Sequence, residues 1–450
     1  MSKYQDYPEY KNTEINWLER LPAHWDVSKL RYMFSFSKGL TITKNDLLDE
    51  GVPCVNYGEV HSKYGFEVNP EIHPLKCVSK SYLISSPNAL LSQGDLVFAD
   101  TSEDIEGSGN FTQLVSEHKL FAGYHTIIAR PKDQKCSRFY AYLLDSQELR
   151  TQIRHAVKGV KVFSITQAIL RGINIWLPMP EEQQKIANFL DHETTKIDTL
   201  IEKQQQLIKL LKEKRQAVIS HAVTKGLNPN APMRDSGVEW LGEVPEHWEV
   251  KRLKHISPKI GVGLVINPST YTRDKGVYFI FGGDVKEYYF DLSKTRRISQ
   301  KDSDNLLPSR LNHRDLVSIR VGYPGITAVV TEEIDGSNCA SVIVIRHGKY
   351  NSDWLCAAMN VWIGRQQVDL VSYGAAQKQF NVADAIDFIF PVPPDDEQNK
   401  IASFVQESLN RFNTLSGKAE QQVGLLQERR TALISAAVTG KIDVRDWQAT

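Results

Sequence analysis

The chain has 450 residues, of which 24% are charged and 41% hydrophobic, a composition typical of a soluble globular protein with more than one domain. It carries 54 basic and 54 acidic residues, and this zero net charge argues against unselective wrapping of nucleic acid by a cationic surface, although a local basic groove is compatible with it. The chain has no apolar run long enough to span a bilayer, no N-terminal signal and no CxxC pair among its five cysteines, so we expect a reduced, cytoplasmic protein.

The first element along the chain is a tryptophan-rich stretch that occurs twice. "NWLERLPAHWDVSKLR" begins at Asn16, and "EWLGEVPEHWEVKRLK" begins at Glu239. Seven of the sixteen positions are identical, including two tryptophans, a proline and a histidine. The chain therefore contains an internal repeat with a period near half its length. His24 and His247 belong to no HExxH or CxxC pattern, so we expect a packing role for them.

The region that follows each tryptophan stretch is predicted to be mixed α/β structure. Apolar and β-branched runs such as "DLVFAD" and "ASVIVIR", bounded by turn-forming residues, predict short strands over 26–177 and 249–390. Short helices are expected at "SRFYAYLLDSQELRTQI" and "SDWLCAAMNVWIGRQQV". A polar, glycine-containing stretch, "HAVKGVKVFSIT" in one half and "VSYGAAQKQFNVA" in the other, precedes the last strand. The halves thus share a plan while their surfaces differ.

A second repeated segment is predicted to be a long helix. "EQQKIANF" from Glu182 matches "EQNKIASF" from Glu397, an offset of 215 (397 minus 182) that also relates "KRQAVISHAVTKG" to "RRTALISAAVTGK". The tryptophan stretches are offset by 223 (239 minus 16), so the α/β region is eight residues longer in the first half. Proline and acids at the start and glycine at the end are typical of helix termini.

Apolar residues within both helical segments recur every seven residues in two rows, which predicts a coiled-coil seam of about six heptads. At about 1.5 Å per residue, each segment would form a rod on the order of 60 Å long that needs a partner, and the other copy is the obvious one. The alternative is that both helices pack separately on a globular core. The predicted helix-pair interface comprises Ile186, Leu190, Ile197, Leu200, Leu207, Leu211, Val218, Ile401, Val405, Phe412, Leu415, Leu426 and Leu433.

Motifs that carry catalysis are mostly missing from the sequence. There is no GxxxxGK[ST] loop and no [ND]PP[YF] signature of an amino-methyltransferase, and "GVGLVI" at Gly261 lacks the third glycine of a dinucleotide fingerprint. "PDDEQNK" resembles the carboxylate and lysine set of a nuclease, but it lies at a helix start, where acids complement the helix dipole. We therefore expect no catalytic residue and no metal site.

The order of these elements resembles that of one protein family. Two "WL...P.HW.V..L" openings, two "P.P..EQ.KIA.F" segments leading into helices that end "LI..AVT.G", and dissimilar α/β regions between them are similar to a type I restriction-modification specificity subunit. "GDLVF" from Gly94 and "RDLVS" from Arg314 fit the family's recurring "GD(I/L)(L/V)" strand, with Arg314 in place of its glycine. The resemblance covers nearly the whole chain.

The resemblance implies a mixed α/β fold class: two α+β target recognition domains joined by two long helices that form an antiparallel coiled coil, with a pseudo-twofold internal repeat. The implied boundaries are a first recognition domain (1–180), a first spacer helix (181–226), a second recognition domain (227–394), a second spacer helix (395–440) and a C-terminal tail (441–450).

The implied function is sequence-specific recognition of double-stranded DNA, with two short half-sites read around an unread gap. Two methyltransferase subunits would use S-adenosylmethionine to modify adenine, and two restriction subunits would translocate and cleave DNA with ATP and Mg²⁺. The resemblance implies that this chain is not an enzyme and binds no cofactor itself.

Candidate DNA-contacting residues follow from the resemblance, which points to loops on one face of each domain, and from side-chain chemistry. Lysine and glutamine suit phosphates and base edges, whereas the alternative for each position is an ordinary solvated loop residue. The candidates are Lys38, Thr41, Thr43, Lys44, Lys158, Lys161, Arg320, Tyr323, Gln377, Lys378 and Gln379.

Two other functions stay open at this point. The chain could be a coiled-coil interaction scaffold whose two α/β modules bind proteins, or the specificity subunit of a related fused nuclease-methyltransferase. Salt dependence separates DNA recognition from a scaffold, because DNA binding weakens steeply with added salt and an apolar protein contact does not.

Overall fold

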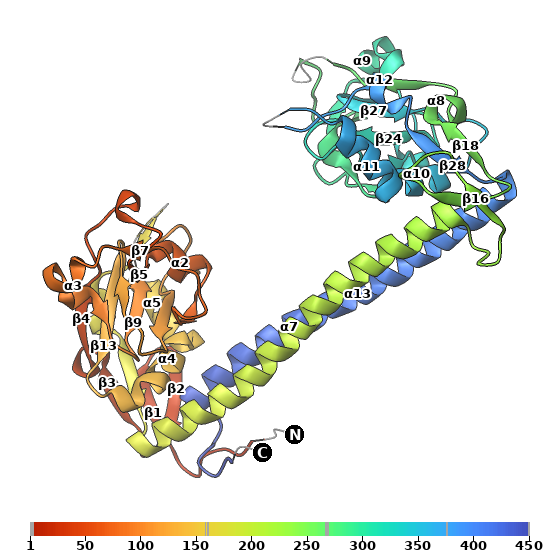
Figure 1. Cartoon of the computed structure of the whole chain (residues 1–450). Coiled ribbons are helices and arrows are strands. Elements are labelled where there is room, and N and C mark those ends of the chain that lie inside the picture. The colour runs from red at the N-terminus through yellow and green to blue at the C-terminus, as the bar shows by residue number, and fades with distance from the viewer. Residues whose placement is uncertain (1–3, 158, 160–161, 266–269, 375–376, 449–450) are drawn as a thin grey trace. The chain divides into compact units, whose positions relative to one another are not determined.

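The computed structural model describes residues 4–157, 159, 162–265, 270–374 and 377–448. The chain divides into two compact units: unit 1 comprises Met1–Gln204 and Gln422–Thr450, and unit 2 comprises Gln205–Gln421. Each unit contains β-sheet, short helices and part of each of two long helices (Figure 1). The mixed α/β class predicted from the sequence is confirmed. No helix within the described ranges is long and apolar enough to cross a membrane.

The central sheet of unit 1 has five strands in the order β4-β13-β9-β11-β6. Strand β13 (Thr126–Pro131) pairs antiparallel with β4 (Phe34–Lys38) and with β9 (Leu96–Ala99), so that Ile127 lies opposite Lys38 and Thr126 opposite Ala99. The ends of β4 and β9 and the start of β13 therefore meet at one edge of the sheet. Strands β11 (Phe111–Leu114) and β6 (Phe66–Val68) complete it.

Strand β9 is buried on both faces, which explains its uninterrupted apolar run. Leu96 and Phe98 belong to one hydrophobic core, and Val97 and Ala99 belong to another, because successive side chains of a strand point to opposite faces. A four-stranded sheet encloses the second core, and its strands in spatial order are β7 (Cys77–Val78), β5 (Val52–Val55), β12 (Leu120–Ala122) and β8 (Leu90–Leu91).

The central sheet of unit 2 has four strands in the order β19-β27-β24-β25. Strand β27 (Val342–Ile345) pairs antiparallel with β19 (Ile260–Val262) and β24 (Leu316–Ile319), and β25 (Thr327–Val329) lies at the edge. A second sheet has the order β23-β20-β26, with strands Arg296–Ile298, Val277–Ile280 and Asn338–Cys339.

Each of the two short segments predicted to be helical contains two helices. Ser146 separates α4 (Ser137–Asp145) from α5 (Gln147–Ala156), because its extended backbone ends the first helix and its hydroxyl accepts a hydrogen bond from the Leu149 amide of the second. In unit 2 an extended residue likewise separates α10 (Ser352–Asn360) from α11 (Trp362–Val371).

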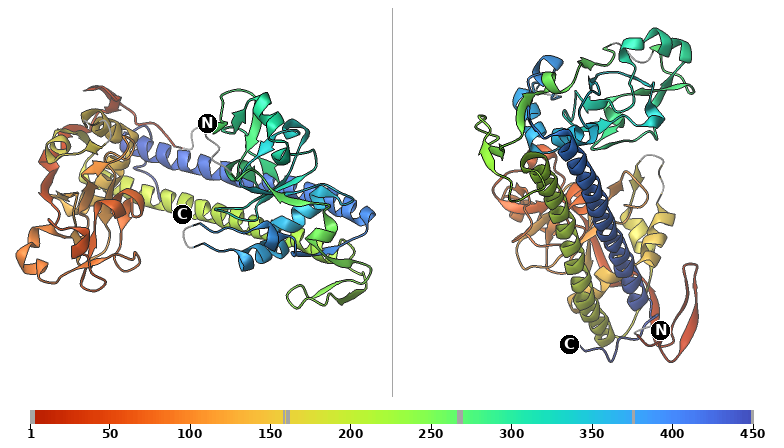
Figure 2. Two further views of the ribbon diagram at one scale, coloured as in Figure 1. Left: turned by 90° about the horizontal axis from the view of Figure 1, so that it is seen from above. Right: turned by 90° about the vertical axis from the view of Figure 1, so that its right-hand side faces the viewer.

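The two long helices are α7 (Pro180–Lys225) and α13 (Asp395–Val438), which lie side by side (Figures 1 and 2). In unit 1 the start of α7 packs against the end of α13, since both contribute to one core and Arg430 Nε donates to Asp198 Oδ1 at 3.0 Å. In unit 2 the end of α7 and the start of α13 contribute to one core. The helices therefore run in opposite directions within each unit.

The predicted helix-pair residues differ in burial. Leu200, Leu207 and Leu415 are 46%, 42% and 41% exposed, so they contribute less to a buried interface than the seven-residue rows predict. Ile201 and Ile208, one position further along, are less exposed than Leu200 and Leu207, because a strict seven-residue row drifts around a helix of 3.6 residues per turn. The buried predicted positions are Ile186, Leu190, Ile197, Ile401 and Val405, and the half-buried ones are Leu211, Val218, Phe412, Leu426 and Leu433.

All five cysteines are free thiols, and every one except Cys77 is buried. Burial raises the pKa of Cys54 and of Cys339 to about 12 and that of Cys136 to about 11, and it raises the pKa of Cys77 and Cys356 as well. Because the thiolate is the nucleophile, we expect iodoacetamide to label Cys77 first in the native protein. Mass spectrometry of tryptic peptides tests this expectation, with the denatured chain as the control; equally fast labelling of Cys356 would contradict it.

Candidate nucleic-acid interface

The two repeated sequence motifs meet at the start of each long helix. In unit 1 the Glu182 carboxylate accepts a hydrogen bond from Trp25 Nε1 at 3.0 Å, and its second oxygen lies 2.8 Å from His24 Nε2. In unit 2 Glu397 accepts from Trp248 Nε1 at 2.9 Å and lies 2.5 Å from His247 Nε2. Both tryptophans are buried. The repeated histidine and tryptophan therefore attach each α/β region to a long helix, beyond the packing role expected for the histidines.

The "GD" and "RD" strand motifs also have structural roles. Asp95 is fully buried and forms an ion pair with Arg130 at 2.8 Å, and Asp315 pairs with Arg346 at 2.5 Å. The residue before each aspartate has a positive φ, 88° at Gly94 and 70° at Arg314. Arginine rarely adopts this conformation; here its guanidinium donates two hydrogen bonds to the Asp353 carboxylate.

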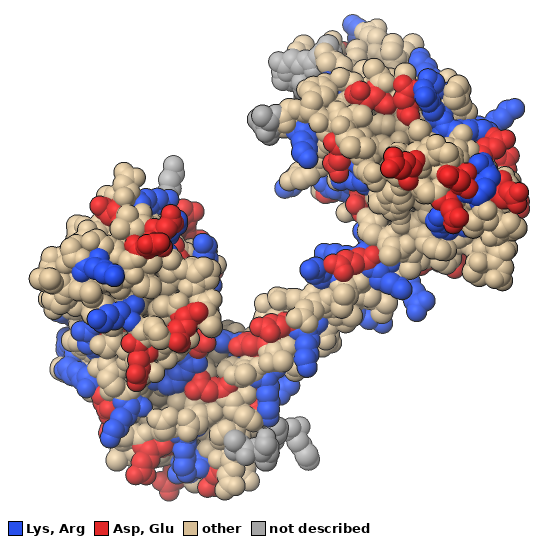
Figure 3. Space-filling view, in the orientation of Figure 1, with Lys and Arg blue, Asp and Glu red and all other residues tan. Residues whose placement is uncertain are grey.

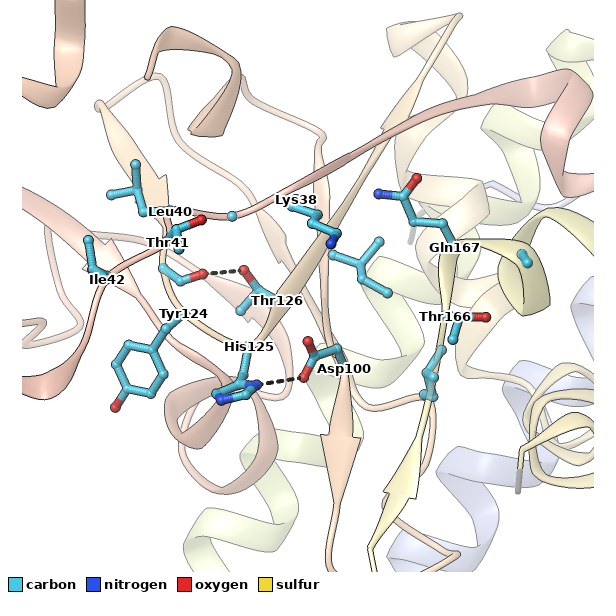
Figure 4. A pocket seen from close by; sticks show the side chains of 15 residues that line it. Lys38, Leu40, Thr41, Ile42, Asp100, Tyr124, His125, Thr126, Thr166 and Gln167 are labelled. Atoms are coloured by element: carbon cyan, nitrogen blue, oxygen red, sulfur yellow. Dashed lines mark hydrogen bonds and ion pairs between the residues drawn. The ribbon is translucent and has the colours of Figure 1, made fainter. Parts of the chain in front are cut away.

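A hollow of about 640 Å³ opens in unit 1 at the sheet edge where β4 and β9 end and β13 begins (Figure 4). Two of the predicted DNA-contacting residues, Lys38 and Thr41, line it. Thr43 and Lys44 follow along the chain, and the Thr43 hydroxyl donates to Asp46 at 2.9 Å, so it caps a short turn. The remaining polar lining comes from Asp100, Tyr124, His125, Thr126, Thr166 and Gln167.

Backbone contacts hold the walls of this hollow together. At Gly39 a Cβ atom would lie 2.1 Å from the Gly123 carbonyl oxygen, so only glycine allows the two segments to approach so closely. His125 has a φ of 54°; its carbonyl accepts from the Asp100 amide at 3.1 Å, and its ring Nδ1 lies 3.2 Å from Asp100 Oδ1. The sequence patterns do not single out Asp100 or His125; the available signal is a polar residue directly after a buried strand.

The structure brings together the predicted residues of unit 2, which come from two distant segments. The Gly322 amide donates to the Lys378 carbonyl at 2.9 Å, and Val321 forms a bridge with Gln379. Tyr323 is 77% exposed at this edge, and Gln377 and Lys378 are also exposed. Arg320, Tyr323 and residues 377–379 thus form one surface. Lys158 and Lys161, the candidates from the corresponding stretch of unit 1, lie outside the described residues.

On the face of the molecule that Figure 3 shows, no large region carries charge of a single sign. On the side seen in Figure 3, basic and acidic side chains are interspersed over both units, and neither forms a continuous field. No group of three or more histidine, cysteine or acidic residues that could hold a metal ion occurs in the part of the chain that the structure describes. On this face, attraction for a phosphate would come from local basic side chains and not from a continuous basic field.

Comparisons with known proteins extend over nearly the whole chain. Residues 22–210 match the type I restriction modification DNA specificity domain. The chain is 23% identical over 447 residues to the putative type I restriction enzyme MjaX specificity subunit of Methanocaldococcus jannaschii, covering 97% of both chains. It is 23% identical over 360 residues to the EcoBI specificity subunit of Escherichia coli, covering 77% of this chain and 74% of that one.

Two solved structures share the fold. A chain from a study of assembly and conformational transition of the type I R-M system superposes with a TM-score of 0.70 at 16% identity, covering 94% of this chain and 99% of that one. The HsdS subunit from Thermoanaerobacter tengcongensis superposes with a TM-score of 0.50 at 15% identity, covering 94% and 98%.

Proposed function

Because the chain belongs to the family of type I restriction-modification specificity subunits, we propose that it is the non-catalytic subunit that selects the DNA sequence on which its partners act. The family membership confirms the resemblance that motif order and spacing predict. The observation that carries the proposal is the similarity to specificity subunits over nearly the full length of the chain. The two α/β units agree with it, because polar residues follow the buried central strand at the corresponding end of the sheet in each.

The target of this chain is a split DNA sequence, with one half-site bound by each unit. Helices α7 and α13 pair as an antiparallel coiled coil that relates the two recognition domains by a pseudo-twofold axis and fixes the length of the unread gap. Their opposite directions within both units support this pairing. A stiff helix pair suits the role, since half-sites one turn of DNA apart are separated by about 34 Å, and a flexible linker would not hold such a spacing.

The partners of this subunit are two methyltransferase subunits and two restriction subunits, working in the cytoplasm. S-adenosylmethionine, ATP and Mg²⁺ act in those partners, and this chain binds none of them. The names of the relatives as specificity subunits support this division of labour.

The DNA-contacting residues are the candidates named from the sequence, with lysines on phosphates and glutamines on base edges. In unit 1 these are Lys38, Thr41, Thr43 and Lys44, with Lys158 and Lys161 from the polar stretch. In unit 2 they are Arg320, Tyr323, Gln377, Lys378 and Gln379. The pairing of Lys378 and Gln379 with the segment after Arg320 supports a single contact surface there.

The experiment that tests the proposed function is a salt titration of the chain, assembled with its methyltransferase subunit, on duplex DNA. Wild-type affinity should fall linearly on a log–log plot, with a slope near −0.9 for each phosphate contacted, by counterion release. An affinity that does not change with salt, or protein capture without DNA binding, would instead favour an interaction scaffold.

Lys378→Ala should weaken DNA binding on all sequences and make the salt slope shallower by about one, because one phosphate contact is lost. The matched control is Lys349→Ala, an exposed lysine that follows the opposite end of β27 from this surface. Titrations of both variants on the same duplex measure the difference. An identical slope for Lys378→Ala and wild type would remove Lys378 from the contact surface.

A further inference from the structure

We propose that the residue immediately after the central buried strand reads a base edge in each half-site, and that its opposite charge in the two units, Asp100 and Arg320, makes the half-sites differ. This inference rests on the proposed function. It assigns Asp100 to the exocyclic amino group of a cytosine and Arg320 to the O6 and N7 atoms of a guanine.

The two residues occupy the same place in their units. Each follows a strand whose last residue pairs with the first residue of the neighbouring strand: Ala99 with Thr126, and Ile319 with Val342. The Asp100 carbonyl accepts from the Ile165 amide at 2.8 Å, and the Arg320 carbonyl accepts from the Phe380 amide at 3.3 Å.

The next residue along the chain continues this correspondence. Thr101 pairs with Ser164 in unit 1, and Val321 forms a bridge with Gln379 in unit 2. Ser164 and Gln379, which belong to the polar stretches before the last strands, therefore lie against this position in their units. The backbone geometry is shared, while the side chain changes from a carboxylate to a guanidinium.

In unit 1 the Asp100 carboxylate lies on the hollow, with its side chain 31% exposed and beside the His125 ring (Figure 4). A carboxylate repels phosphate, so it cannot strengthen contact with the DNA backbone. It can accept a hydrogen bond from an amino group on a base edge, and cytosine N4 is the usual partner of an acidic side chain in the major groove. Lys38, on the wall of the same hollow, can supply attraction for phosphate.

In unit 2 the distribution of charge is different. Ile127 and Ile343 are each the second residue of the strand next to the central strand. Ile127 pairs with Lys38 and Ile343 pairs with Val262, so Val262 occupies in unit 2 the position that Lys38 has in unit 1. The cation of this site is instead Arg320, which is partly exposed and whose Nε atom is buried without a hydrogen-bond partner among the described residues. The guanidinium fork matches guanine O6 and N7 in a bidentate contact.

The test expresses the chain with its methyltransferase subunit in a host without adenine methylation and maps modified adenines by long-read sequencing. Asp100→Asn should relax one position in one half-site by about 10- to 100-fold, because the amide also offers a donor and tolerates pairs that the carboxylate rejects. Arg320→Gln should change one guanine to adenine in the other half-site, since glutamine suits adenine N6 and N7. Asp100→Glu should retain the wild-type preference.

The control variant is Glu103→Gln, which removes an exposed charge three residues beyond Asp100 and should leave both half-sites unchanged. If a variant gives no methylation, its purified complex is tested for DNA binding instead. Its affinity is measured for a duplex that carries the wild-type target and for a duplex in which the C·G pair is replaced by T·A. A wild-type motif that persists in both Asp100→Asn and Arg320→Gln overturns this inference alone. A wild-type complex without any split motif overturns the proposed function instead.

Discussion

Glu182→Ala is expected to destabilise unit 1 by about 3 kcal/mol, because it leaves two buried donors and a histidine without their acceptor. The carboxylate of Glu182, whose side chain is only 8% exposed, accepts from Trp25 Nε1 at 3.0 Å and from the Tyr7 hydroxyl at 2.7 Å. Equilibrium unfolding in denaturant, followed by tryptophan fluorescence, measures the change. The matched control is Glu181→Ala, an exposed acid in the same helical turn, for which we expect a loss below about 1 kcal/mol.

The equivalent change in unit 2, Glu397→Ala, should cost less, about 2 kcal/mol, since fewer buried donors depend on this carboxylate. The Glu397 side chain is 31% exposed and accepts from Trp248 at 2.9 Å. Equal losses for Glu181→Ala and Glu182→Ala would contradict the view that the repeated motifs attach the helix to the α/β region.

Inserting one heptad into both long helices should lengthen the unread gap of the target by about three base pairs while both half-sites stay the same. Seven residues add about 10 Å to a helix, and base pairs are spaced about 3.4 Å apart. The insertions belong near Gln205 and Gln421, where the chain divides between units 1 and 2. A whole heptad keeps the apolar rows on the same helix faces, apart from a small rotation.

Mapping of methylated adenines, with the methyltransferase subunit present, measures the gap in this variant. The control inserts seven polar residues at Ile72, which is 71% exposed in a loop of unit 1, and should leave the gap unchanged. An unaltered gap in the two-helix variant would show that the helices do not set the spacing. Loss of methylation at both half-sites would indicate failed assembly.

Local sequence signals locate the long helices well. Proline and acids at the start and glycine after the end predict two long helices, and the structure has helices at Pro180–Lys225 and Asp395–Val438. Which apolar residues are buried between the two helices is less predictable. Leu200 and Leu207 follow the heptad spacing, but both are exposed. Which rows are buried depends on the packing of the partner helix, and sequence spacing alone does not contain that information.

The partners of the repeated residues could not be predicted either. From the sequence, Glu182 is an acid that complements the helix dipole, but its carboxylate contacts Tyr7, His24 and Trp25, which are 175, 158 and 157 residues away. The same holds for the candidate interface: Lys38 and Gln379 are predicted as polar contact residues, whereas Asp100 and His125 become part of a site only through the register of β4, β9 and β13. Sequence spacing does not encode that register across segments so far apart.

The most direct test of DNA selection by two units is to map adenine methylation by long-read sequencing, with the chain and its methyltransferase subunit in a host lacking this modification. We expect a split motif in which exchange of residues 26–177 for those of a relative changes one half and leaves the other half and the gap intact. Methylation without a split motif, or a change in both halves on exchanging one region, would contradict the account.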